Sequence, residues 1–267
     1  MKATVNGIAL NYEVSGPASA PPVVLHHPIA TNLSVWDELA AALQSRYRVI
    51  RLDARGHGQS EAPQGAYAFE TLAADVIGLM DHLGVAKARF VGLSIGGMVG
   101  QHLGFLHPGR FHSLCLVSTT SAVPAQARVL WDERIRNAAA HGMASVVEGS
   151  IARWVAPGTV ETKPGLLARL TAMIETTPPD GYIGWCHAVR DLDITGRLTE
   201  ITLPTRIIAG ALDPATPPAM AEVIHRATAG SDLVVIPGVS HMLHVEAPEA
   251  FHASVLPFLD AHGPAGC

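Results

Sequence analysis

Ser94 lies in a segment whose residue types suit a nucleophile. Residues 92–96 read Gly-Leu-Ser-Ile-Gly and directly follow a short apolar stretch. Glycines on both sides of a serine permit a sharp strand-to-helix turn, because larger residues would clash with the neighbouring strand and helix. A serine hydroxyl is a weak nucleophile at neutral pH, so the chemistry also requires a base and a third group that orients this base.

Two other residues are candidates for those roles. Asp213 and His241 each follow a short apolar segment that we predict to be a strand, as Ser94 does. The C-terminal ends of parallel strands meet at one edge of a sheet, where open α/β sheets bind ligands. We therefore predict that Ser94, His241 and Asp213 form a catalytic triad of nucleophile, base and orienting acid.

The reaction also requires N–H donors for the oxyanion that develops in the transition state. The first predicted donor is the backbone N–H of Ile95, at the start of the helix after Ser94. The second should come from the loop after the predicted strand 22–26, where residues 26–30 read His-His-Pro-Ile-Ala. Proline has no N–H, so we predict Ile29 as the second donor, with His27 behind it.

The order of elements predicts an α/β fold with a doubly wound, mostly parallel sheet. Asn6-Gly7 between apolar residues indicates a hairpin over residues 2–14. Further along, short apolar segments alternate with segments of helical periodicity. The predicted strands are 22–26, 47–53, 89–93, 113–117, 205–209 and 232–236. The predicted helices lie near 32–45, 69–83, 95–106, 217–228 and 247–261.

One stretch interrupts this alternation. Residues 121–197 show helical periodicity only, broken by prolines, and carry three of the four tryptophans. A helical insertion with aromatic residues is typical of a lid over the C-terminal edge of the sheet. We therefore predict a core formed by residues 1–120 and 198–267, and a helical cap formed by residues 121–197.

Composition excludes several classes of partner. The 267-residue chain has a net charge of −5, and no cluster of Lys or Arg offsets this charge, so nucleic-acid binding is not expected. No apolar run is long enough to span a bilayer, and the N-terminal residues lack the apolar stretch of a secretory signal. We expect a cytoplasmic protein that acts on a small molecule; the oligomeric state stays open.

Metal and cofactor chemistry is not expected either. Cys115, Cys186 and Cys267 are far apart and form no C-x-x-C pair, which argues against a disulfide framework or a thiolate zinc site. The adjacent histidines 26 and 27 point to opposite sides of the chain, and no carboxylate cluster accompanies them.

Four segments together resemble the α/β-hydrolase superfamily, and within it 3-oxoadipate enol-lactonase and its close relatives. They are the serine segment 92–97, the segment 53–60 (Asp-Ala-Arg-Gly-His-Gly-Gln-Ser), and the runs around Asp213 and His241. The serine–acid–histidine order along the chain is also that of the superfamily. The resemblance implies a cofactor-free serine hydrolase that cleaves a small ester or lactone through an acyl-enzyme, most like an enol-lactonase of aromatic catabolism.

The resemblance also suggests substrate contacts. In such lactonases an Arg-Trp pair in the cap, here Arg153 and Trp154, would meet a substrate that carries a free carboxylate; a guanidinium suits this because its planar fork binds a carboxylate at two points. Trp185 of the insertion, and His27 and Leu243 beside the reacting centre, are further predicted substrate contacts. The loops 26–30 and 242–244 differ from the small polar residues of those lactonases.

Alternatives remain open at this stage. The same triad would serve a carboxylesterase, a hydrolase of C–C bonds or a cofactor-free haloperoxidase or perhydrolase. A ligand receptor that kept the fold but turns over slowly or not at all is a hypothesis of a different class. Serine at position 94 disfavours haloalkane dehalogenases and epoxide hydrolases, which use an aspartate there.

Overall fold

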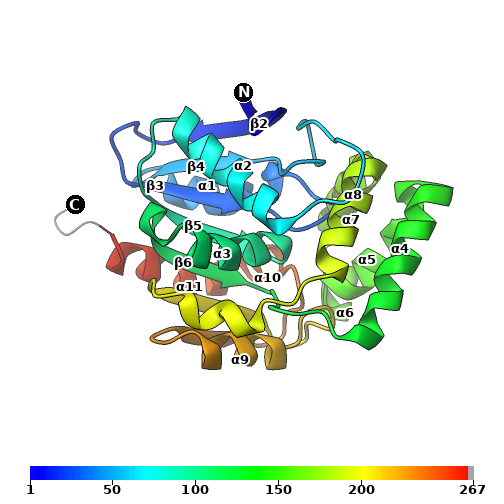
Figure 1. Cartoon of the computed structure of the whole chain (residues 1–267). Helices are drawn as coiled ribbons and strands as arrows, with labels where there is room; N and C mark the ends of the chain where they lie inside the picture. The colour runs from blue at the N-terminus through cyan, green and yellow to red at the C-terminus, as the bar shows by residue number, and fades with distance from the viewer. Residues whose placement is uncertain (264–267) are drawn as a thin grey trace.

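The computed structural model describes residues 1–263 of the chain, which contain one eight-stranded sheet. The strand order is β1-β2-β4-β3-β5-β6-β7-β8 (Figure 1). All pairs from β4 to β8 are parallel, and β1 and β2 are antiparallel. The bounds are β1 Lys2–Val5, β2 Ile8–Ser15, β3 Pro22–His26, β4 Arg48–Leu52, β5 Ala88–Leu93, β6 Phe111–Val117, β7 Thr205–Gly210 and β8 Asp232–Ile236. The predicted doubly wound, mostly parallel sheet is confirmed.

Helices cover both faces of this sheet (Figure 1). α2 and α3 pack against each other on one face, and α1 packs against α11 on the other. The bounds of the helices outside the insertion are α1 Asp37–Leu43, α2 Phe69–His82, α3 Ile95–Leu106, α9 Pro218–Ala227, α10 Leu243–Glu246 and α11 Pro248–Ala261. The short helix α10 was not predicted, because four residues are too few to show a helical period.

The N-terminal hairpin follows from its turn residues. Asn6 and Gly7 both have positive φ, 47° and 79°, which is the conformation of a type I′ turn. Val5 and Ile8 face each other across the turn and lie in the core. This hairpin extends the sheet on the side of β4.

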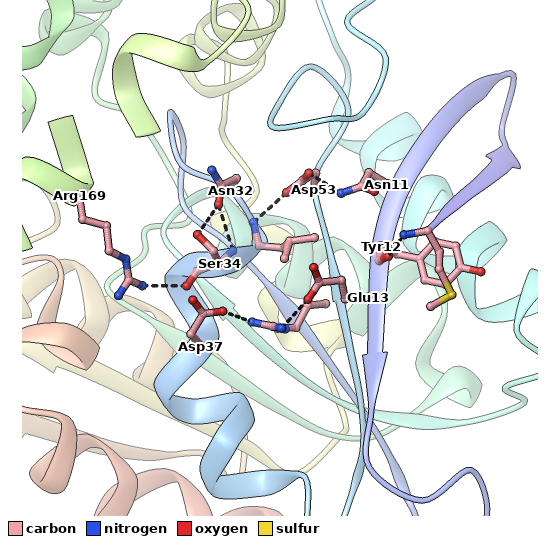
Figure 2. Close-up of polar contacts among 11 residues, drawn as sticks. Asn11, Tyr12, Glu13, Asn32, Ser34, Asp37, Asp53 and Arg169 are labelled. Carbon is pink, nitrogen blue, oxygen red and sulfur yellow. Dashed lines mark hydrogen bonds and ion pairs between the residues drawn. The ribbon is translucent and has the colours of Figure 1, made fainter. Parts of the chain in front are cut away.

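A carboxylate network holds the loop after β3 in place. Asp53, at the end of β4, accepts hydrogen bonds from the Leu33 amide at 2.8 Å and from Asn11 Nδ2 at 2.8 Å (Figure 2). Gly58 must be glycine, because a Cβ there would lie 2.2 Å from an Asp53 oxygen. The segment 53–60 therefore holds the connection between β3 and α1 in place.

The insertion between β6 and β7 is helical, as predicted. It contains α4 Arg128–His141, α5 Val147–Trp154, α6 Pro157–Thr162, α7 Pro164–Thr176 and α8 Pro179–Arg190. These helices lie together beside the sheet in Figure 1, with α4 packed against α8. From α7, Arg169 donates to the carbonyl of Ser34, just before α1 (Figure 2).

Two further properties of the described residues bear on function. None of their helices is long and apolar enough to cross a membrane. Cys115 and Cys186 are free thiols that are buried in the core, where burial raises the pKa of each to about 12. Cys267 lies outside the described residues.

Candidate active site

The backbone at Ser94 is strained in the way the nucleophile prediction requires. Ser94 has φ 58° and ψ −113°, a conformation that L-residues rarely adopt. The flanking glycines are needed because the turn is tight: a Cβ at Gly92 would lie 2.2 Å from the Gly96 carbonyl oxygen, and one at Gly96 would lie 2.4 Å from the His26 oxygen. The Ser94 amide donates to the Val117 carbonyl at 2.8 Å, which ties the turn to the end of β6.

Asp213 and His241 are joined directly. His241 Nδ1 lies 2.8 Å from Asp213 Oδ2. The other Asp213 oxygen accepts from the amides of Ala215 and Thr216, at 2.8 and 3.0 Å. Burial opposes ionisation of this carboxyl, but His241 and the hydrogen bonds from His241 and Thr216 hold the pKa of Asp213 below its usual value. Asp213 is therefore an ionised acceptor that places the His241 proton on Nδ1.

Ser94 and His241 line the same cavity, which has a volume of about 280 Å³. The cavity lies between the ends of the strands and the insertion, because residues of α4, α5 and α8 also line it. Within the described residues, the Ser94 hydroxyl forms no hydrogen bond with His241. Such contacts are often long without substrate and shorten when it binds.

Two backbone donors lie at this cavity. Ile29 and Ile95 both line it beside Ser94. Across residues 1–263, neither amide donates a hydrogen bond to another group. Ile95 is the first residue of α3, where the helix leaves its N–H groups unpaired and carries partial positive charge. The pair suits an oxyanion that forms next to Ser94.

The loop that carries Ile29 is braced by buried histidines rather than open to a ligand. His57 Nε2 accepts from the Ala30 amide at 2.9 Å, and His27 Nε2 accepts from the Ala54 amide at 2.9 Å. Burial lowers the pKa of both imidazoles, so they are neutral acceptors. His27 is fully buried and does not line the cavity, which corrects its prediction as a substrate contact.

Trp185 and Leu243 also do not line the cavity. Both are completely buried in the core. Trp185 donates from Nε1 to the Arg55 carbonyl at 2.7 Å and packs edge-on against Phe69. Their placement corrects the prediction that they touch substrate: the aromatic ring of Trp185 fills space between α8 and the sheet instead.

Arg153 and Trp154 do line the cavity, and Arg134 lines it with them. In the described part of the chain, neither arginine forms an ion pair with a carboxylate. Burial, with the nearby charge of Arg134, lowers the pKa of Arg153 to about 10. Arg134 lies 4.3 Å above the Trp131 ring. The cavity therefore holds two cationic groups that are free to bind an anion.

Sequence reasoning missed Arg134 and Thr216. Arg134 follows Trp131 by three residues, a spacing that places both on one face of α4. Thr216 follows Asp213 by three residues and donates its hydroxyl to that carboxylate at 2.7 Å. Both spacings are visible in the sequence, but only the fold shows that they face the site. No group of three or more His, Cys, Asp or Glu within residues 1–263 could hold a metal ion.

Known proteins share this architecture along nearly the whole chain. 3-Oxoadipate enol-lactonase 2 of Acinetobacter baylyi is 35% identical over 252 residues, which cover 94% of this chain and 93% of that protein. A putative carbamate hydrolase of Variovorax paradoxus is 30% identical, with 94% and 96% covered. The crystal structure of the enol-lactonase from Burkholderia xenovorans superposes with a TM-score of 0.94 at 35% identity and covers 97% of this chain and 100% of that one.

The family comparison agrees with the fold and with these relatives. The model of the alpha/beta hydrolase fold matches residues 21–248, from β3 to the start of α11. The matched part includes the strained serine turn and the Asp213–His241 pair. The chain therefore belongs to the α/β-hydrolase family, and its similar relatives include 3-oxoadipate enol-lactonases.

Proposed function

We propose that this protein is a serine hydrolase that cleaves a small ester or lactone through an acyl-enzyme on Ser94. The observation that carries the proposal is the combination of the strained Ser94 turn with the Asp213–His241 hydrogen bond at one cavity. In this proposal Ser94 is the nucleophile, His241 the base and Asp213 the orienting acid. A receptor without turnover would not need this combination.

Acylation begins when Ser94 Oγ attacks the substrate carbonyl carbon. His241 Nε2 takes the hydroxyl proton, while Asp213 stabilises the imidazolium through Nδ1–H. The carbonyl oxygen becomes an oxyanion that accepts from the Ile29 and Ile95 amides. When the tetrahedral intermediate collapses, the C–O bond to the leaving alkoxide breaks and His241 returns the proton to it. In a lactone, the leaving oxygen stays attached to the acyl chain.

Deacylation repeats these steps with water. His241 takes a proton from water as the water oxygen attacks the acyl-enzyme carbonyl. The same two amides stabilise the second oxyanion. Collapse releases the carboxylic acid and returns the proton to Ser94, so the enzyme needs no cofactor.

The substrate class follows from the cavity walls. We propose that the substrate carries a carboxylate that Arg153 binds, with Trp154 beside it, because Arg153 has no ion-pair partner among the described residues. The names of the lactonase relatives support this class, since 3-oxoadipate is a dicarboxylate. The helices of residues 121–197 act as the cap that closes this cavity over the triad.

The test compares Ser94→Ala with wild type on an enol-lactone, simple aryl esters and a vinylogous diketone. Removing the nucleophile should lower kcat on the preferred substrate by about 10³-fold or more and leave the circular dichroism spectrum unchanged. The control is Ser254→Ala, a half-buried serine on α11 whose hydroxyl donates to the Ala250 carbonyl. Near-normal turnover by Ser94→Ala contradicts the proposal, and the preferred substrate separates the lactonase from an esterase or C–C hydrolase.

A further inference from the structure

Glu246 is a buried carboxylate outside the catalytic groups. It ends the short helix α10, five residues after His241, and is 8% exposed. Oε2 accepts from the Ser240 amide at 2.7 Å. Oε1 accepts from the Ala156 amide at 2.7 Å and from the Thr159 hydroxyl at 2.6 Å. Three donors therefore bond to the two carboxylate oxygens, both of which accept hydrogen bonds.

These donors come from two segments that carry different parts of the site. Ser240 directly precedes His241. Ala156 lies in the connection between α5 and α6, and Thr159 lies in the first turn of α6, shortly after Arg153 and Trp154. One carboxylate thus bridges the histidine of the triad and the cap residues that line the cavity.

Further hydrogen bonds join the same two segments. The Met242 amide donates to the Trp154 carbonyl at 2.8 Å. Ser240 Oγ donates to the Arg153 carbonyl at 3.2 Å. Outside these two segments, Lys163 Nζ, at the start of α7, also donates to the Glu246 carbonyl at 2.9 Å. We call the contact of residues 153–159 with residues 240–246 the cap–histidine junction; Glu246 is the member whose side chain binds both sides.

We propose that Glu246 is a positioning residue that holds His241 and the Arg153–Trp154 wall of the cavity in one fixed arrangement. The inference rests on the proposed function and adds a link between substrate binding and proton transfer. A substrate carboxylate bound at Arg153 then fixes the Arg153 and Trp154 carbonyls, which accept from Ser240 and Met242 on either side of His241. Binding of the substrate carboxylate at Arg153 therefore aligns His241, and loss of Glu246 impairs both substrate binding and proton transfer.

The amide variant Glu246→Gln separates this role from simple burial. Gln keeps the size of the side chain but has only one oxygen, so its NH₂ group must face either the Ser240 amide or the two cap donors. One side of the cap–histidine junction is then released. Glu249→Gln is the matched control, because Glu249 is exposed on the first turn of α11.

The experiment uses two esters that share a leaving group: p-nitrophenyl acetate, which is neutral, and mono-p-nitrophenyl succinate, which carries a carboxylate. Misplacing a catalytic group by about 1 Å can cost about 10²-fold in rate, so Glu246→Gln should lower kcat on both esters by roughly 10- to 100-fold. KM should rise about tenfold for the succinate ester alone. Glu249→Gln should match wild type on both.

A purely structural role predicts something different. It would lower the thermal midpoint but leave kcat unchanged per folded molecule, so rates are measured well below the midpoint of each variant, with the folded fraction taken from circular dichroism. A kcat of Glu246→Gln within twofold of wild type on both esters overturns the inference. Turnover by Ser94→Ala would instead overturn the proposed function, so the two failures are distinguishable.

A second variant keeps the inference testable if Glu246→Gln does not fold. Thr159→Val removes one donor to Glu246 and retains the shape of the side chain. It should raise KM for the succinate ester about threefold and lower kcat on both esters by a smaller factor than Glu246→Gln. Wild-type kinetics of Thr159→Val on both esters would contradict the link between the cap and His241.

Discussion

Two arginines that form no ion pair within residues 1–263 give the cavity its chemical character at the residue scale. Arg153 and Arg134 lie on different helices of the insertion and line the same space as Ser94. Placing two cations side by side without a carboxylate partner is unfavourable, and the lowered pKa of Arg153 reflects its burial beside Arg134. Such an arrangement gains most from an anionic ligand, because the ligand removes the repulsion between the arginines.

We therefore expect Arg153→Met to impair binding selectively. KM for mono-p-nitrophenyl succinate should rise by about 10- to 100-fold, which corresponds to the roughly 1.5–3 kcal/mol of a charge-assisted hydrogen bond. KM for p-nitrophenyl acetate should stay within about twofold of wild type. Arg136→Met, an exposed position on α4, is the control. Equal changes for the two esters would show that Arg153 does not bind the carboxylate.

At the scale of elements, the nucleophile turn depends on close approach between β5, α3 and β3. Gly96 lies against the His26 carbonyl at the end of β3, the strand that leads into the Ile29 loop. The packing of α3 thus fixes the distance between Ser94 and the loop that carries Ile29, the proposed second oxyanion donor. His57 supports the same loop through Ala30, whose φ is 54°.

Gly96→Ala should disrupt this arrangement. The new Cβ would lie 2.4 Å from a backbone oxygen, so α3 must shift, at a cost of about 1–3 kcal/mol in the free energy of unfolding. We expect kcat to fall by about 10²-fold or more, because the shift moves Ser94 relative to Ile29. Urea unfolding and steady-state kinetics measure the two effects.

Gly165→Ala is the control for this substitution, because a Cβ at that position meets nothing within 4 Å. Unchanged kinetics and stability of Gly96→Ala would mean that the turn tolerates a Cβ and that the close approach is not required.

The elements and the placement of the three residues of the proposed triad are predictable from sequence because their signals are local. Periodicity identifies the strands and helices, Gly-Leu-Ser-Ile-Gly identifies the turn at Ser94, and the strand ends place Asp213 and His241 on one edge. The walls of the cavity are not predictable in this way. Whether Trp185 faces the cavity or the sheet depends on how α8 packs, and that packing involves residues from three other segments: β3, residues 53–60 and α2.

At the scale of the whole molecule, the parallel sheet buries several histidines in neutral form. Burial lowers the pKa of His26 and of His244 to about 3. His26 lies at the end of β3, and His244 lies against the ring of Trp36 near α11. Because unfolding returns both imidazoles to a pKa near 6.5, the unfolded chain binds more protons than the folded protein below that pH.

The free energy of unfolding should therefore decrease as the pH falls below 6.5. Each of these two histidines contributes a loss of about 1.4 kcal/mol between pH 7.5 and pH 5.5, so together they contribute about 3 kcal/mol. Urea unfolding at both pH values measures this loss, and His244→Phe should reduce it by about half. A protein equally or more stable at pH 5.5 would contradict neutral burial.

The proposed acyl-enzyme requires a covalent bond to Ser94. Rapid mixing with mono-p-nitrophenyl succinate, acid quenching and intact-mass analysis measure this bond directly. We expect a species heavier by one succinyl group, mapped to the peptide that contains Ser94, together with a burst of one nitrophenol per site. His241→Ala should form this species far more slowly. Steady turnover with no adduct, or an adduct on another residue, would contradict the assignment of Ser94 as the nucleophile.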